Sequence, residues 1–354
     1  MRRCIFLLIA LLFLHSDAHA LELPDALCDA LPHEVTELAE EGSPSLLSGG
    51  AALIWAELRA AVRSAFEASL RGAVLLSLAA LLTGAAEGFG TALGETTRYV
   101  TLAGVLGVTT LAAGDLNSLI GLGAATMQDL SSFTKLLLPT MAAALAGCGG
   151  IFTASAWQVG TLFAADLLST LIHSLLLPLV YCHIALAAAG AALPESGLDR
   201  LADGLKKLIS WLLCGAVTAF SLYLSLSSVL TGSADRAAVK AAQAALSGTV
   251  PIVGGILADS AEAVLGAAHS LRAVIGAVGV LGVLFLCLTP LVRLGVQFLL
   301  YRAAAFVSAV GGAKPLERLL EQLGDAFALV FGMTAACAAL LLVSLLVSVS
   351  MVVT

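Results

Sequence analysis

The sequence predicts an all-α protein, a polytopic membrane helical bundle with broken or re-entrant segments. Three observations predict it: hydrophobic residues make up 60% of the chain, charged residues make up only 12%, and long apolar runs recur along it. An ordinary soluble domain carries roughly a quarter of charged residues. The mean hydropathy of +1.02 leaves too little polar surface to coat such a chain in water. A lipid bilayer removes that requirement, and apolar runs of about 20 residues cross it as α-helices.

The charge balance and the cysteine pattern exclude two classes of function. The formal net charge is −7, whereas a nucleic-acid-binding protein needs a basic stripe. The cysteines include no CxxC pair and no cluster with histidine, so we predict no metal site and no redox cofactor. Cysteines within apolar runs are interpreted as small buried hydrophobic residues.

Residues 1–20 are predicted to be a signal peptide. Arg2 and Arg3 precede an apolar run over residues 4–14, and a small-x-small pattern ends at Ala20. This order is typical of a cleavable secretion signal. The alternative is an uncleaved anchor. In both cases the residues that follow start outside the cytoplasm.

Residues 21–70 form an exported polar lead-in, and residues 71–354 form the multi-spanning membrane domain. Within the lead-in, helical spacing of apolar residues predicts an amphipathic helix over residues 53–70. The apolar stripe consists of Trp55, Leu58, Val62 and Phe66. This helix lies on the membrane surface, packs against a partner, or simply leads into the first span.

The membrane domain contains a series of apolar runs. They cover residues 72–86, 100–123, 136–152, 162–193, 208–230, 250–268, 273–292 and 326–354. Residues 136–152 and 250–268 are the weaker runs, since the first is short and glycine-rich and the second carries two carboxylates. We expect these two to be re-entrant elements or hairpins.

Basic residues predict the orientation of the bundle. One cluster follows the run 162–193 and the other precedes the last run; their members are Arg200, Lys206, Lys207, Arg293, Arg302, Lys314 and Arg318. The positive-inside rule places both clusters in the cytoplasm. Because the chain starts outside, its C-terminus is expected to end outside as well.

Small residues at regular spacing predict close helix packing. Gly84 and Gly88 form a GxxxG pair, and Gly276, Gly279 and Gly282 recur every three residues. Helices in lipid associate through such positions, because small side chains let the backbones approach.

Polar residues inside the apolar runs are the first candidates for a pore, a cavity or a proton relay. Asp115 and Asn117 interrupt the second run, and Asp166 and His173 lie on one face of a later run, seven residues apart. Ionisable groups in spans are costly and often functional. The alternative is local hydrogen bonding near a span end. The sequence contains no Walker A loop, nucleophile elbow or HExxH motif, so we predict no enzyme and no catalytic residues.

The segment around Pro251 is the second candidate region. An amphipathic helix over residues 231–250 leads to a break at Pro251, and Gly254 loosens the backbone beyond it. Asp259 and Glu262 are three residues apart and share a helix face. Two neighbouring carboxylates at membrane depth repel each other, which favours a pore wall or a hinge facing water. The alternative is a solvated helix at the membrane surface.

Several of these motifs, in this order and spacing, resemble the stage III sporulation protein AE family. They are Arg236 with Lys240, the run 249–254, Asp259, the Gly276/Gly279/Gly282 repeat, the run 136–139 followed by Gly149 and Gly150, the run 177–179, and Gly311 with Gly312. The resemblance covers most of residues 70–354.

The resemblance implies a non-enzymatic integral membrane component of the mother-cell-to-forespore channel, a secretion-like complex, in which the chain is membrane platform or conduit. The implied partners are other proteins of the stage III sporulation A operon, namely an ATPase, small membrane proteins and ring-forming proteins, together with a forespore membrane protein. The implied location is the mother-cell membrane around the forespore. The residues alone also allow an independent secondary transporter for an unknown solute, since broken helices and polar midplane groups are typical of that class. The oligomeric state stays open, a homo-oligomer included.

Overall fold

The computed structural model describes residues 43–90, 96–193, 196–247 and 254–350, and its regular elements there are all helical. They are α4 (Ser43–Gly90), α5 (Thr96–Gly147), α6 (Ile151–Leu171), the π-helical turn η1 (Ile172–Leu176), α7 (Leu177–Ala192), α8 (Leu198–Ser247), α9 (Gly254–Val310) and α10 (Lys314–Ser350). Within these ranges six helical segments are long and apolar enough to cross a membrane, with α6, η1 and α7 counted as one. The predicted all-α class is confirmed.

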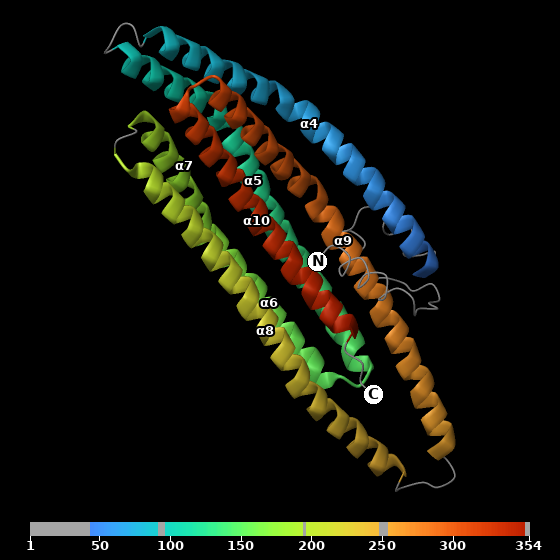
Figure 1. The fold of residues 1–354 in the computed structure, drawn as a ribbon. Helices are drawn as coiled ribbons and strands as arrows, with labels where there is room; N and C mark the ends of the chain where they lie inside the picture. The colour runs from blue at the N-terminus through green and yellow to red at the C-terminus, as the bar shows by residue number, and fades with distance from the viewer. Residues whose placement is uncertain (1–42, 91–95, 194–195, 248–253, 351–354) are drawn as a thin grey trace.

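The helices lie side by side in an elongated bundle and alternate in direction along the chain (Figure 1). The α7–α8 and α9–α10 turns lie at one end, and the α5–α6 turn and the end of α10 lie at the other. Helix α9 packs against α4, α5 and α10, whereas α8 packs against α6, α7 and α10. Helix α10 therefore joins the two sides of the bundle.

The helices are much longer than a bilayer is thick. Helix α5 has 52 residues and α9 has 57, which gives lengths of roughly 80 Å at 1.5 Å per residue. The hydrocarbon core of a membrane is about 30 Å thick. Both helices must extend well beyond it.

This length corrects the expectation that residues 136–152 are re-entrant. Helix α5 continues through the gap between the two apolar runs and ends at Gly147, and Ile151 begins α6. Residues 254–268 are likewise the first part of α9 rather than a separate element. A polar stretch does not end a helix by itself, because adding residues to an existing helix is favourable. A turn needs a residue that adopts a non-helical backbone conformation. At the α5–α6 turn this residue is Gly149, whose φ is 84°.

A break does occur within the run 162–193. At η1 the backbone N–H of Leu177 donates to the carbonyl of Ile172, five residues back. Pro178 follows at the start of α7 and has no N–H to donate. The π-helical turn accommodates the loss of the hydrogen bond that Pro178 cannot form, so the chain stays helical from α6 into α7.

Helix α4 contains the amphipathic stretch expected over residues 53–70, but the face it buries is different. Trp55, Val62 and Phe66 are exposed, while Ala61 and Ala65 are buried. Helix α4 packs along α9, and alanines permit a closer approach than bulky side chains do. Trp55, Val62 and Phe66 are left facing outward, as on a surface in contact with lipid.

The glycine positions confirm the predicted close packing in part. A Cβ atom added to Gly84 would lie 2.4 Å from the carbonyl oxygen of Gly311, and one added to Gly276 would lie 2.3 Å from Val349 Cγ2. At Gly279 the nearest atom, Leu137 Cδ2, would be 2.8 Å away. Gly88 faces open space. Glycine is therefore required where α4 meets the α9–α10 turn.

Candidate functional site

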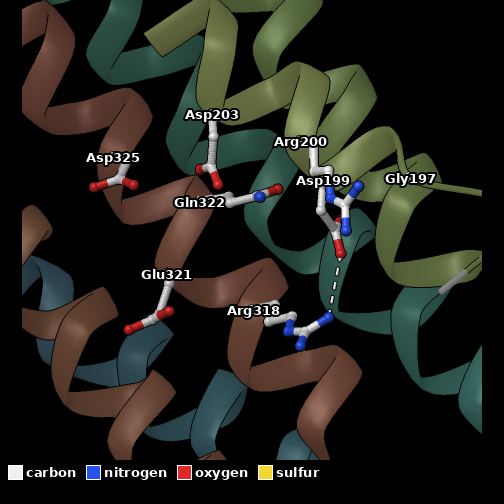
Figure 2. A pocket seen from close by; sticks show the side chains of 8 residues that line it. All are labelled: Gly197, Asp199, Arg200, Asp203, Arg318, Glu321, Gln322 and Asp325. Carbon is white, nitrogen blue, oxygen red and sulfur yellow. Dashed lines mark hydrogen bonds and ion pairs between the residues drawn. The ribbon is translucent and has the colours of Figure 1, made fainter. Parts of the chain in front are cut away.

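Charged side chains gather at the end of the bundle where the α7–α8 and α9–α10 turns lie; this is called the charged end below. They surround a recess of about 610 Å³ between α8 and α10 (Figure 2). The recess is lined by Gly197, Asp199, Arg200, Asp203, Arg318, Glu321, Gln322 and Asp325. Sequence analysis found this basic cluster only as a guide to orientation and missed the carboxylates that accompany it.

Asp325 is the centre of the charged end. The side chain is only 9% exposed, and both of its oxygens are paired. Lys206 Nζ of α8 lies 2.8 Å from Oδ2, and Arg302 Nη2 of α9 donates to Oδ1 at 2.8 Å. Arg302 also donates to Glu321 Oε1 at 3.1 Å. A buried carboxylate is tolerated when charged donors satisfy it, so this network ties three helices together.

The recess itself is more open. Arg318 Nη1 of α10 donates to Asp199 Oδ2 of α8 at 3.4 Å across its mouth (Figure 2). Arg200 and Asp203 line it and are exposed. Neither side chain has a polar partner within the described part of the chain. The recess therefore offers one cation and one carboxylate to a molecule from outside.

His183 is a further structural residue near this end. Its side chain is fully buried, with Nδ1 3.1 Å from the carbonyl oxygen of Ala202 and Nε2 3.1 Å from that of Gln322. The imidazole thus links α7 to α8 and α10. The sequence shows only a histidine in an apolar run and gives no signal for these two contacts.

Among the predicted candidates, Asp115 lies at a helix junction. Its Oδ2 accepts a hydrogen bond from Gln297 Nε2 at 2.9 Å and one from the Tyr301 hydroxyl at 3.4 Å. Gln297 and Tyr301 are buried in α9. A Cβ atom at Gly72 of α4 would lie 3.3 Å from the same oxygen, so α4, α5 and α9 meet here. Asn117 is exposed and is not part of this group.

The structure does not join Asp166 to His173. Asp166 is exposed on α6, and His173 is half-buried in η1. His173 Nδ1 lies 2.9 Å from the carbonyl oxygen of Ser169, one turn back. Within the described residues no hydrogen bond or ion pair links the two side chains, and His173 is held by local backbone hydrogen bonding.

The Pro251 region is described only in part. Pro251 lies outside the described residues, and Gly254 is the first residue of α9. Asp259 and Glu262 lie on α9, but their side chains fall outside the described part of the structure. They stay predictions.

The opposite end of the bundle holds buried charge as well. Asp235 of α8 is fully buried and accepts hydrogen bonds from the backbone N–H groups of Phe152 and Thr153, at 2.8 and 2.9 Å, which caps α6. Arg272 of α9 is 1% exposed and donates to the carbonyl of Val349. Burial raises the pKa of the nearby Cys148 thiol, an effect that Arg272 opposes.

Between the two ends the described pockets are apolar or very small. A largely apolar pocket of about 650 Å³ lies between α6, α8 and α10, with Phe163, Phe220 and Leu340 in its lining. Two cavities between α5, α6 and α10 measure only about 20 and 10 Å³, room for about one water molecule. Among the described residues no three His, Cys, Asp or Glu side chains converge closely enough to hold a metal ion.

These features define a multi-pass α-helical membrane protein. The family model described as stage III sporulation protein AE matches residues 51–352, and the chain belongs to that family. The resemblance seen in the sequence is confirmed.

The stage III sporulation protein AE of Bacillus subtilis (strain 168) is 24% identical to the chain over 244 residues. The match covers 69% of this chain and 59% of that protein. No solved structure matches the chain.

Proposed function

We propose that the chain is a non-enzymatic membrane component of the mother-cell-to-forespore channel, a secretion-like complex, and that it acts mainly as the membrane platform. The observation that carries this proposal is the open, charged recess at one end of the bundle, whereas the described pockets farther along the bundle are very small or lined by apolar side chains. A bundle whose charged surface lies at one end suits an anchor for other subunits. A conduit built from this chain would have to pass between copies or between the chain and its partners.

The charges support an orientation for the platform. The basic cluster Arg200, Lys206, Lys207, Arg302 and Arg318 lies at the charged end. The positive-inside rule favours the mother-cell cytoplasm for this end. The recess would then face the cytoplasmic ATPase of the complex. The opposite end would face the space between the two membranes, with the ring-forming proteins and the forespore partner.

The alternative, an independent secondary transporter, has two observations in its favour. Asp115, Gln297 and Tyr301 form a polar group inside the bundle, and the π-helical turn η1 breaks a neighbouring pass. A transporter would bind a solute in the absence of other proteins. A platform would be unstable or inactive without its partners.

The test is deletion of the gene in its host, followed by microscopy of sporulating cells and complementation. We expect arrest after engulfment, with small and collapsing forespores. A double reversal in the recess, Arg200→Glu with Asp203→Lys, should fail to complement although the protein accumulates normally. The matched control is the reversal Arg63→Glu with Glu67→Arg, an exposed pair on α4. Normal spores in the deletion strain would contradict the proposal.

A further inference from the structure

Helix α5 carries a polar stripe on its exposed side. Gln128, Asp129, Ser132 and Lys135 are all exposed and follow one another at helical spacing. Asp166 is exposed on the neighbouring helix α6. These five residues are called the α5–α6 patch below. In the sequence the α5 residues look like a loop between two apolar runs, but in the structure they lie in the middle of a continuous helix.

Contacts with α10 fix the level of the patch in the bundle. One small cavity brings together Met127, Leu130, Ser131 and Thr134 of α5, Ala165, Leu168 and Ser169 of α6, and Cys337, Leu340 and Leu341 of α10. Helix α10 has no Asp, Glu, Lys or Arg from residue 326 to residue 350, so residues 337–341 lie near the middle of its uncharged run. The patch lies at the same level. This is the depth at which the centre of a hydrocarbon core about 30 Å thick is expected.

Lys135 and Asp166 lie beside the same contact between two helices. Lys135 directly follows Thr134, and Asp166 directly follows Ala165, so each stands beside the contact between α5 and α6. Helix α10 closes the inner side of that contact. Since Lys135 and Asp166 are exposed, they flank the contact on its outer side.

Lipid is a poor neighbour for this surface. Charged side chains at the bilayer centre are costly unless they pair or reach water. Within the described part of the chain, Asp129, Lys135 and Asp166 form no ion pair. The long apolar stretches around them hold them away from the membrane surface. Something other than lipid must cover the patch.

We propose that the α5–α6 patch is the interface with a second copy of this chain. In a dimer with a two-fold axis along the membrane normal, both copies use the same surface. If α5 of one copy contacts α6 of the other, then α6 of the first copy contacts α5 of the second. Lys135 and Asp166 have opposite charge and lie at about the same depth. Each lysine therefore meets the aspartate of the partner copy, and two such pairs form per dimer. The patch concerns assembly, so the proposal holds whether the chain acts as platform or conduit.

The experiment counts the copies of the fluorescently labelled full-length chain in each nanodisc or liposome by single-molecule photobleaching. We expect dimers for the unaltered chain. Lys135→Asp or Asp166→Lys alone brings like charges together and should raise the dissociation constant by about tenfold or more. The double reversal should restore dimers, because the pairs re-form with opposite polarity. The matched control is again Arg63→Glu with Glu67→Arg, which should leave dimerisation unchanged.

A photo-reactive amino acid at Ser132 gives a second measurement that does not depend on charge reversals folding correctly. In sporulating cells it should cross-link to a second, differently tagged copy. Cross-links only to lipid, or only to a different protein, would overturn the proposal. So would a monomeric unaltered chain, or a double reversal that stays monomeric while each single variant inserts normally. None of these results bears on the deletion phenotype, so the proposed function is tested separately.

Discussion

At the scale of single residues, the charged end shows how a membrane bundle can bury a carboxylate. Asp325 is paired on both oxygens, once from α8 and once from α9. Removing one partner of a buried ion pair is more damaging than replacing the whole pair, because a buried charge is left uncompensated. Arg302 adds a contact with the ring of Phe298, 5.5 Å from its centroid. The network is thus strong evidence for a fixed arrangement of three helices.

Asp325→Ala is expected to lower the free energy of unfolding by about 3 kcal/mol, the low end for a broken buried pair, since Lys206 and Arg302 are each more than a third exposed. The matched control is Arg318→Ala, which breaks the exposed pair with Asp199 and should cost less than about 1 kcal/mol. Thermal unfolding of both variants in detergent measures the difference. Equal melting temperatures would show that Asp325 does not tie the helices together.

At the scale of helices, hydropathy predicted which parts of the chain are apolar but not where helices end. The runs 100–123 and 136–152 are apolar, yet α5 contains the first run together with most of the second, and the second run continues through the α5–α6 turn. Polar residues between two runs indicate a loop only when they face water. In α5 the polar residues occupy one side of a helix whose other side is packed. A hydropathy average along the sequence does not distinguish the two sides of a helix.

The sequence likewise predicted part of the candidate site, namely Asp115, but not the charged recess. Asp115 was found from its charge within an apolar run, and it does contact Gln297 and Tyr301. The charged recess was not found, because Asp199 and Asp325 are more than a hundred residues apart in sequence. Only the packing of α8 against α10 brings them together.

Glycine at position 84 provides a prediction about helix packing. Gly84→Ala places a Cβ atom 2.4 Å from a backbone oxygen of the α9–α10 turn, which cannot move aside as a flexible side chain could. We expect a loss of about 1–3 kcal/mol in stability. Gly88→Ala, one turn away with open space around it, should be neutral or slightly stabilising. Melting temperatures of the two variants decide the matter, and equal values would contradict close packing at Gly84.

At the scale of the whole molecule, an even or odd number of membrane crossings determines whether the two ends of the bundle's chain lie on the same side of the membrane. The six segments alternate in direction, so the start of α4 and the end of α10 lie at the same end (Figure 1). The charged end is the other one. An even number of crossings thus agrees with the predicted orientation, in which the chain enters from outside and its C-terminus returns there.

Cysteine labelling in intact protoplasts tests this orientation. Asp203→Cys places a thiol in the recess at the charged end, and Ala238→Cys places one on the exposed side of α8 toward the opposite end. A membrane-impermeant thiol reagent should label the cysteine at position 238 and spare the one at position 203 until the membrane is opened. The unaltered chain, with its native cysteines, gives the background. The reverse pattern would place the recess outside the cytoplasm and would contradict the orientation that the basic residues predict.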